Sequence, residues 1–502
     1  MNFDANYFYP VTAEIFVALM VLAIMLATAF ARGIARGLAY ALTQLTLVVA
    51  ALMTLAALHG EPGTATNLFA DETGSFINMF VQDRLGGVLK FAVYCTMMVA
   101  LLYGRDYLAA RRLDRPEFFL LALLATLGMM VMITANHLLV LYIGLEMMSL
   151  ALYALVAFDR DSTRSTEAGM KYFVLGAVAS GLLLYGMSMI YGATGTLDLP
   201  AVSQAVASQT DKREVLLFGL VFLVAGVSFK LGVVPFHMWV PDVYQGAPTA
   251  VTLIVSSAPK IAAFAFALRL LVGGLSGLAA HWQTMLMLVA AASIVLGNVA
   301  ALAQRNIKRM LAYSGISHMG FMLLGLLSGI VEGKSGLTND AYASAMFYAI
   351  SYALMTLAAF GMVVLLSRSG FEAEDIEDFK GLNRRSPWFA LMMLFVMFSM
   401  AGIPFFVGFF AKFAVLEAAV AAGYLWLAVL AVVMSVIGAF YYLRVVKLMY
   451  FEEPDVNAPL AAPPELQVLL SVNGLAIAVL GLMPGGLLHA CGAAIEALHL
   501  GS

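Results

Sequence analysis

The chain has 502 residues, of which 63% are hydrophobic and 11% are charged, and its formal net charge is −3. This composition excludes a soluble domain of such length and is typical of a membrane protein that crosses the bilayer many times, with no indication of a nucleic-acid partner. The two cysteines, Cys95 and Cys491, are too distant for a metal cage, and no nucleotide-binding loop motif is present, so we expect no cofactor or metal in the chain itself.

The predicted elements are about fourteen membrane-spanning helices, each an apolar run of about 20 residues, in an all-α fold. In chain order the runs cover 13–32, 37–58, 86–104, 117–135, 137–158, 167–192, 214–244, 248–271, 282–303, 309–330, 341–367, 387–421, 424–448 and 465–490. The seventh run contains Pro235, and the twelfth contains Gly402 and Pro404. Because proline interrupts a helix, we expect both runs to be broken helices, which transporters place around ion paths.

The two predicted breaks lie five spans apart, which predicts an internal repeat. Spans four to eight (117–271) and nine to thirteen (282–448) would be equivalent units, and five helices per unit would invert the second unit relative to the first. The segment 1–116 supplies three preceding helices and 449–502 a final one. We therefore expect 1–502 to form a single transmembrane domain.

Lysines and arginines away from the middle of the spans fall mostly in alternate loops: 17, including Lys308, lie on one side, and six lie on the other, namely Arg84, Lys90, Lys212, Arg213, Arg269 and Lys334. By the positive-inside rule the more basic side is the inner side of the membrane. The segment that begins at Arg111 and the one that contains Arg384 are then expected inside. Both termini and the loop near Pro62 are expected outside.

Four charged residues are expected near the middle of the membrane. At about 1.5 Å per residue, Glu146 lies roughly 14 Å deep in span five and Lys260 roughly 18 Å deep in span eight. Lys230 and Lys412 sit beside the two predicted breaks. Ionisable groups at this depth are costly and usually functional, so we interpret the four as groups that carry protons.

Lys171, His237 and His318 are further candidates for this pathway. Lys171 lies near the inner end of span six, where its side chain could instead reach the interface. His237 follows the first break, where it could relay protons or bond freed backbone carbonyls. His318, in span ten, is open to the same two interpretations.

Lysine suits proton storage because burial favours its neutral form and a nearby carboxylate favours its charged form. A lysine with a movable carboxylate partner is thus a store whose proton affinity changes. The alternative is structural: Glu146 and Lys230 would form an inert ion pair, and the other lysines would carry no proton.

Three stretches carry a family resemblance: "PFHMWVPDVYQGAPTAVTLIVSSAPKIAAF" from Pro235, "NIKRMLAYSGISHMGFMLLG" and "AGIPFFVGFFAKFAVL". They resemble the antiporter-like subunits of respiratory complex I, the proton-pumping NADH:quinone oxidoreductase, and most closely the pattern of its subunit N. The subunit M pattern usually has a glutamate where this chain has Lys412. The resemblance covers essentially the whole chain.

The resemblance implies a membrane-arm subunit that translocates protons, driven by NADH oxidation and quinone reduction in other subunits. It implies subunits M, K, J and A and membrane lipids as partners. It places FMN and iron–sulfur clusters in partner subunits, ubiquinone at another subunit, and the complex in a bacterial inner membrane. Glu146 and Lys230 resemble the family's coupling pair, Lys260 its connecting lysine, and Lys412 its terminal proton donor.

Two other functions remain open at this point. The chain could be a subunit of a multi-subunit monovalent cation/proton antiporter, since that related family shares the fold and the lysines. It could also be a structural spacer with inert charges.

Overall fold

The computed structural model describes residues 11–30, 35–59, 79–208, 212–331, 337–367, 371–454 and 463–496. Within these ranges thirteen helical stretches are long and apolar enough to cross a membrane, and the predicted all-α membrane fold is confirmed. The two termini, the loop that begins near Pro62, and the basic residues Arg32, Lys334 and Arg368 lie outside the described residues.

The first half of the chain contains α1 (Thr12–Phe30), α2 (Ala35–His59), α3 (Arg84–Ala110), α4 (Pro116–Thr134), α5 (Leu138–Val156), α6 (Thr163–Thr194), α7 (Leu199–Ser208), α8 (Arg213–Leu231), α9 (Trp239–Gly246), α10 (Thr249–Ser256) and α11 (Ala258–Ala267). The second half contains α12 (Ala279–Leu302), α13 (Ile307–Leu327), α14 (Leu337–Leu366), α15 (Leu382–Arg385), α16 (Pro387–Ala401), α17 (Val407–Ala421), α18 (Leu425–Phe451), α19 (Pro464–Leu482) and α20 (Gly485–Glu496).

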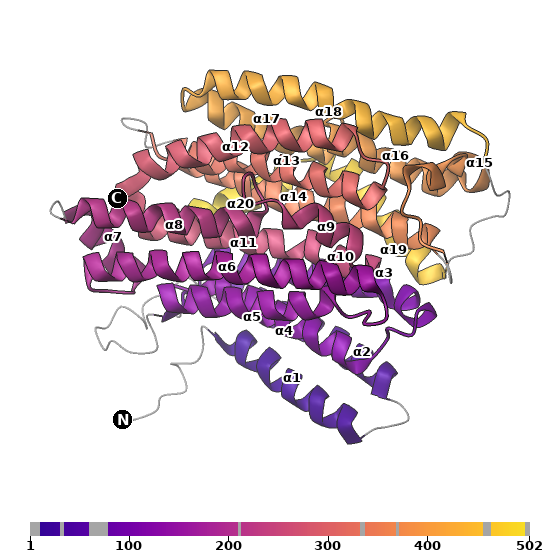
Figure 1. Cartoon of the computed structure of the whole chain (residues 1–502), viewed down its shortest axis with the longest axis horizontal. Coiled ribbons are helices and arrows are strands. Elements are labelled where there is room, and N and C mark those ends of the chain that lie inside the picture. Colours follow the sequence, from indigo (N-terminus) through magenta and orange to yellow (C-terminus); the bar gives the residue numbers. More distant parts are fainter. Residues whose placement is uncertain are drawn as a thin grey trace.

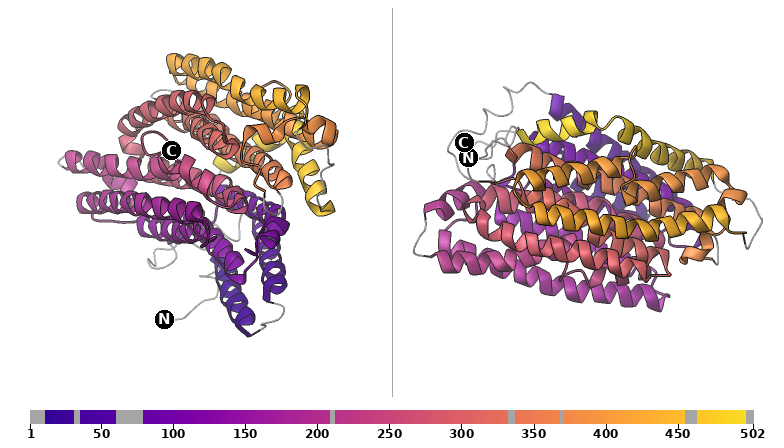
Figure 2. Two further views of the ribbon diagram at one scale, coloured as in Figure 1. Left: turned by 45° about the vertical axis from the view of Figure 1, so that its right-hand side comes forward. Right: turned by 90° about the horizontal axis from the view of Figure 1, so that it is seen from above.

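The long helices run side by side, so the bundle has two ends (Figures 1 and 2). The short helix α7, which the hydropathy pattern did not predict, lies at one end, and α15 lies at the other (Figure 1). We refer to these as the α7 end and the α15 end. The helices of the chain's first half occupy one side of the bundle, and those of its second half occupy the other.

Both predicted breaks are present, and they have the same local structure. Span seven divides into α8 and α9, and span twelve divides into α16 and α17. The first half-helix ends each time at a glycine in the left-handed region, Gly232 (φ 74°) or Gly402 (φ 88°). The amides of each glycine and of the residue after it turn back to carbonyls in the last turn, which is a Schellman cap.

Two further breaks were not predicted. Span eight, expected to be continuous over 248–271, is interrupted at Ser257 between α10 and α11 and continues as a π-helix, Leu268–Gly274. The final span, expected over 465–490, divides into α19 and α20 at Met483 and Pro484. In each case a proline close to the break removes a backbone donor.

The outermost helix, α1, is held by a buried ion pair. Only 28% of its apolar window is buried, and it lies at the edge of the bundle (Figure 1). Glu14 on α1 accepts hydrogen bonds from the Lys90 ammonium on α3 at 3.0 Å and from the Thr134 hydroxyl at 3.2 Å. Lys90 was expected at the outer side of the membrane, but its side chain is 7% exposed. This contact joins α1 to both α3 and α4.

Removing one member of this pair is expected to destabilise the protein more than removing both. Lys90→Met leaves Glu14 buried without its cation, which costs about 3–5 kcal/mol for a broken buried pair. The double variant Glu14→Gln/Lys90→Met should recover much of that loss because no buried charge remains. Thermal unfolding of the purified protein measures both, and equal losses in the two variants would contradict the prediction.

Candidate functional site

The ammonium of Lys230 is held by hydroxyl groups of α5. Lys230 is the penultimate residue of α8 and is 8% exposed. Its Nζ donates to Ser149 Oγ at 2.8 Å and to Tyr153 OH at 3.4 Å. Ser149 Oγ in turn donates to the carbonyl of Leu145 at 2.5 Å. The ammonium is therefore bonded to neutral groups.

Glu146, one turn before Ser149 on α5, points to a different partner. Its carboxylate accepts a hydrogen bond from the Ser180 hydroxyl on α6, and its side chain is only half-buried. Within the described part of the chain no ion pair of 4.0 Å or less joins Glu146 to Lys230. The structure therefore places the two predicted partners on adjacent helices, with the Ser149 hydroxyl bonded to Lys230 and the carboxylate turned to Ser180.

Lys260 binds the end of the first half-helix. It lies on α11, just past the unpredicted break at Ser257, and is 2% exposed. Its Nζ donates to the carbonyl of Leu231 at 2.8 Å and to that of Lys230 at 3.5 Å, and lies 5.1 Å from the centre of the Trp239 ring. The side chain of one candidate lysine is thus bonded to the backbone of another.

Lys412 does the same at the second break. Its Nζ donates to the carbonyls of Met400 and Ala401, both at 3.0 Å, and to Ser435 Oγ on α18 at 2.8 Å. The Ser435 hydroxyl also donates to the carbonyl of Ala401 at 3.3 Å. Lys412 is 8% exposed, so these contacts are made away from solvent.

With these contacts, the carbonyls of the last turn of each half-helix all have donors. In α8 the Schellman cap bonds the carbonyls of Ser228 and Phe229, and Lys260 bonds those of Lys230 and Leu231. In α16 the cap likewise bonds the first two carbonyls of the last turn, and Lys412 bonds the last two. A cation at a helix C-terminus is also favoured by the helix dipole. Lys260 and Lys412 therefore stabilise the two breaks, and they do so more strongly when charged than when neutral.

His318 is the centre of a buried hydroxyl cluster in the second half. It lies on α13 and is 3% exposed. Its Nδ1 lies 2.7 Å from Tyr348 OH and its Nε2 lies 3.1 Å from Tyr442 OH, which is bonded to Ser314 Oγ at 2.5 Å. The Phe321 ring stacks on that of Tyr348, with centroids 6.3 Å apart, and Lys412 Nζ lies 5.1 Å from the Phe321 centroid.

Lys171 lies apart from the other three lysines. It pairs with Glu167 at 2.8 Å and with Asp242 at 3.0 Å, its side chain is 45% exposed, and it borders a cavity of about 140 Å³. Asp242 also binds Arg309 at 2.7 Å. This cluster joins the first turn of α9 to α6 and α13, so it positions the half-helix that carries Trp239.

His237 lies in the segment between α8 and α9. It is half-buried, and its Nδ1 has no hydrogen-bond partner among the described residues. The structure does not bring it into contact with any of the four candidate charges.

Several polar groups of the site were missed by sequence reasoning. The hydroxyls of Ser149, Ser180 and Ser435 carry no signal in an apolar run, because serine in a helix commonly bonds its own backbone. Arg269, expected at the outer side of the membrane, is buried and binds Asp83 at 2.9 Å. Lys308, assigned to an inner loop, is 1% exposed and binds Glu374 at 3.1 Å. Within the described ranges no three His, Cys, Asp or Glu side chains gather as metal ligands would.

Comparisons with known proteins agree on the family. Residues 135–438 match the model of the NADH:quinone oxidoreductase/Mrp antiporter transmembrane family. The chain is 68% identical to the NADH-quinone oxidoreductase subunit N of Azoarcus sp. (strain BH72) over 98% of both chains. It is 54% identical to that of Nitrosomonas europaea over 96% of this chain and 97% of the relative.

Solved structures give the same result. A chain of respiratory complex I from Thermus thermophilus is 31% identical, with a TM-score of 0.79 over 96% of this chain and 100% of that chain. A chain of the Mrp complex from Dietzia sp. has a TM-score of 0.83 over 98% of this chain and 97% of that chain, but at 21% identity it is similar in fold alone.

The second break is expected to depend on the fit between Gly402 and Lys412. Gly402→Ala forces alanine into the left-handed region, at about 1–2 kcal/mol, and places a Cβ 3.0 Å from Lys412 Cδ. Gly423→Ala is the matched control, because Gly423 has φ +94° and open space around it. Melting temperatures of the two variants should differ, with Gly402→Ala lower. Equal melting temperatures would show that the lysine does not constrain the break.

Proposed function

The chain belongs to the NADH:quinone oxidoreductase/Mrp antiporter membrane family and is a membrane subunit of the subunit N type, and from this premise we propose that it carries protons through the membrane arm of complex I along the row Glu146, Lys230, Lys260 and Lys412. The energy comes from NADH oxidation and quinone reduction in other subunits. The observation that carries the proposal is that Lys260 and Lys412 bind the carbonyl ends of the two broken helices.

These contacts link proton loading to backbone position. A charged Lys260 bonds the carbonyl of Lys230, and this cap and the dipole interaction are worth about 0.3–1 kcal/mol, or up to about 2 when partly buried. When Lys260 gives up its proton, the end of α8 loses that attraction and can move together with the Lys230 side chain. Lys412 acts in the same way on α16, and internal water in the breaks bridges the gaps between the stores.

Glu146 acts as the partner that changes the proton affinity of Lys230. It is turned toward Ser180 while Lys230 is bonded to Ser149. Movement of the carboxylate toward Lys230 would favour the charged lysine, and return to Ser180 would favour proton release. His318 serves as a relay in the second half. Lys171 positions α9, and we assign no proton step to His237.

The inverted repeat is part of the proposal. It is supported by the matching Schellman caps and by two close helix pairs, α4 with α5 at Gly128 and α12 with α13 at Gly297. The units 117–271 and 282–448 would then each supply one half-helix that ends at a left-handed glycine and one capping lysine.

The environment of the chain follows from the same proposal. Subunits M, K, J and A and membrane lipids would cover its outer faces, FMN and iron–sulfur clusters would lie in partner subunits, and ubiquinone would bind at another subunit. The antiporter alternative is less favoured, because the Mrp similarity is one of fold while the relatives over 50% identical are subunits N.

We place the α15 end inside and the α7 end in the periplasm of a bacterial inner membrane. The ion pairs of Arg111, Arg164, Lys308 and Arg309 lie in the loops and helix ends assigned to the inner side, as the positive-inside rule requires. Both termini would then be periplasmic.

Cysteine labelling tests this orientation. In a chain without Cys95 and Cys491, a cysteine at Asp161 should react with a membrane-impermeant reagent only from the inner side. A cysteine at Ala280 should react only from the outer side. Both positions are exposed in loops or at helix starts. Labelling of both from one side would overturn the topology.

Lys230→Arg tests the proton-carrying role. Arginine keeps the positive charge but does not release its proton at accessible pH, so the complex should assemble and lose most of its proton pumping. The measurement is NADH-driven acidification of inverted membrane vesicles, normalised to assembled complex. Lys447→Arg is the matched control, because Lys447 is 69% exposed at the chain's surface. Wild-type pumping by the Lys230 variant would mean that this lysine is a structural cation.

A further inference from the structure

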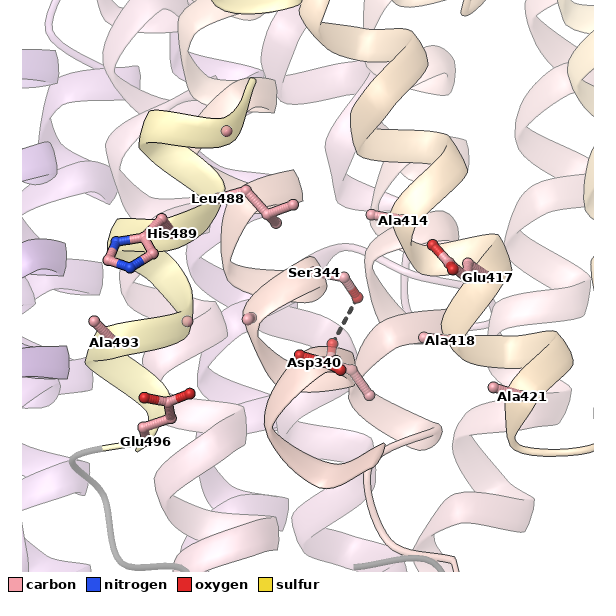
Figure 3. A pocket seen from close by; sticks show the side chains of 14 residues that line it. Asp340, Ser344, Ala414, Glu417, Ala418, Ala421, Leu488, His489, Ala493 and Glu496 are labelled. Atoms are coloured by element: carbon pink, nitrogen blue, oxygen red, sulfur yellow. Dashed lines mark hydrogen bonds between the residues drawn. The ribbon is translucent and has the colours of Figure 1, made fainter. Parts of the chain in front are cut away.

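A cavity of about 520 Å³ opens between α14, α17 and α20. Its walls include small residues such as Ala414 and Ala418, and its polar groups are Asp340, Ser344, Glu417, His489 and Glu496 (Figure 3). Asp340 and Glu496 lie at the helix ends assigned to the outer face, α14 beginning and α20 ending there. The cavity is large enough for many waters, and its carboxylates make it favourable for cations.

The cavity is the outer end of a polar stripe on α14. Asp340, Ser344, Tyr348, Tyr352 and Thr356 recur at every fourth position, so each lies about one turn from the next along a row that winds slowly around the helix. Asp340 and Ser344 line the cavity. Tyr348, one turn further, is bonded to His318, and the Tyr352 ring lies 5.3 Å from the His318 ring. The row thus leads from the cavity to the buried His318 cluster.

Ser344 is the most deeply buried polar residue of the cavity wall. It is 2% exposed, packs against α13 at Gly325, and donates to the carbonyl of Ala341 at 2.7 Å. One helical turn, about 6 Å along the axis, separates Ser344 from Tyr348. Water bound between the two hydroxyls would complete the connection.

We propose that this cavity is the outer mouth of a proton outlet that runs from His318 through Tyr348 and Ser344 to Asp340. The proposal rests on the proposed function, because it needs protons to reach His318. Tyr348 accepts a proton from His318 Nδ1 while its own hydroxyl proton passes to water beside Ser344, so Tyr348 is unchanged after each transfer. The water passes the proton to the Asp340 carboxylate or directly to the outer solution.

Cysteine chemistry on the intact complex tests the outlet. The variants are Ser344→Cys and, as the matched control, Ala345→Cys, both in a chain without Cys95 and Cys491. Ala345 is the next residue on α14, is fully buried and does not line the cavity. Spheroplasts are treated from outside with a positively charged, impermeant methanethiosulfonate reagent, and inverted vesicles are then prepared for NADH-driven pumping.

We expect the cysteine at 344 to be labelled and to lose most of its pumping relative to the same sample left unlabelled. The cysteine at 345 should be neither labelled nor affected. Failure to label position 344 while a rim cysteine at Ala421 is labelled would overturn the outlet, because the cavity would not reach Ser344. Labelling without loss of pumping would also overturn it. Either result, together with the expected loss in Lys230→Arg, would leave the proposed function intact.

Discussion

The structure depends on one constraint: inside a membrane, a backbone carbonyl without a donor costs several kcal/mol. Each broken helix creates a turn of such carbonyls near the middle of the chain's apolar bundle. The glycine caps satisfy those deeper in the turn, and Lys260 or Lys412 satisfies the last two. The lysines are therefore held at these positions by the breaks, and the breaks are stabilised by the lysines. A group that stabilises the backbone more strongly when charged is suited to couple proton binding to movement.

Much of the fold could be predicted from the sequence because long apolar runs, and prolines within them, act locally. Pro235 and Pro404 located the breaks of spans seven and twelve correctly. Pro259 and Pro484 carried the same signal, but both breaks were missed. Pro259 lies in a run short enough to be one continuous helix, and Pro484 lies near the end of its run. The amphipathic helix α7 was missed because it is too short and too polar to register as a span.

The candidate site was predictable only as a set of residues. The depth of a charge in an apolar run identifies Glu146, Lys230, Lys260 and Lys412, but the groups that they bind lie far away in sequence. Lys230 binds a hydroxyl 81 positions earlier and His318 binds one 124 positions later. No local pattern encodes such pairings, because they arise from helix packing. Lys90 and Arg269 were misplaced for a related reason: each lies near a helix end, where only the tertiary partner decides between loop and interior.

The buried pair of Glu14 and Lys90 has a consequence for how the chain enters the membrane during synthesis. As α1 emerges it carries a carboxylate within an apolar segment that has few packing partners of its own. Its cation lies on α3, which is made later. Until α3 arrives, α1 can lower this cost by protonating Glu14 or by keeping it at the bilayer surface. The third helix thus supplies the cation that lets Glu14 stay charged in the folded bundle.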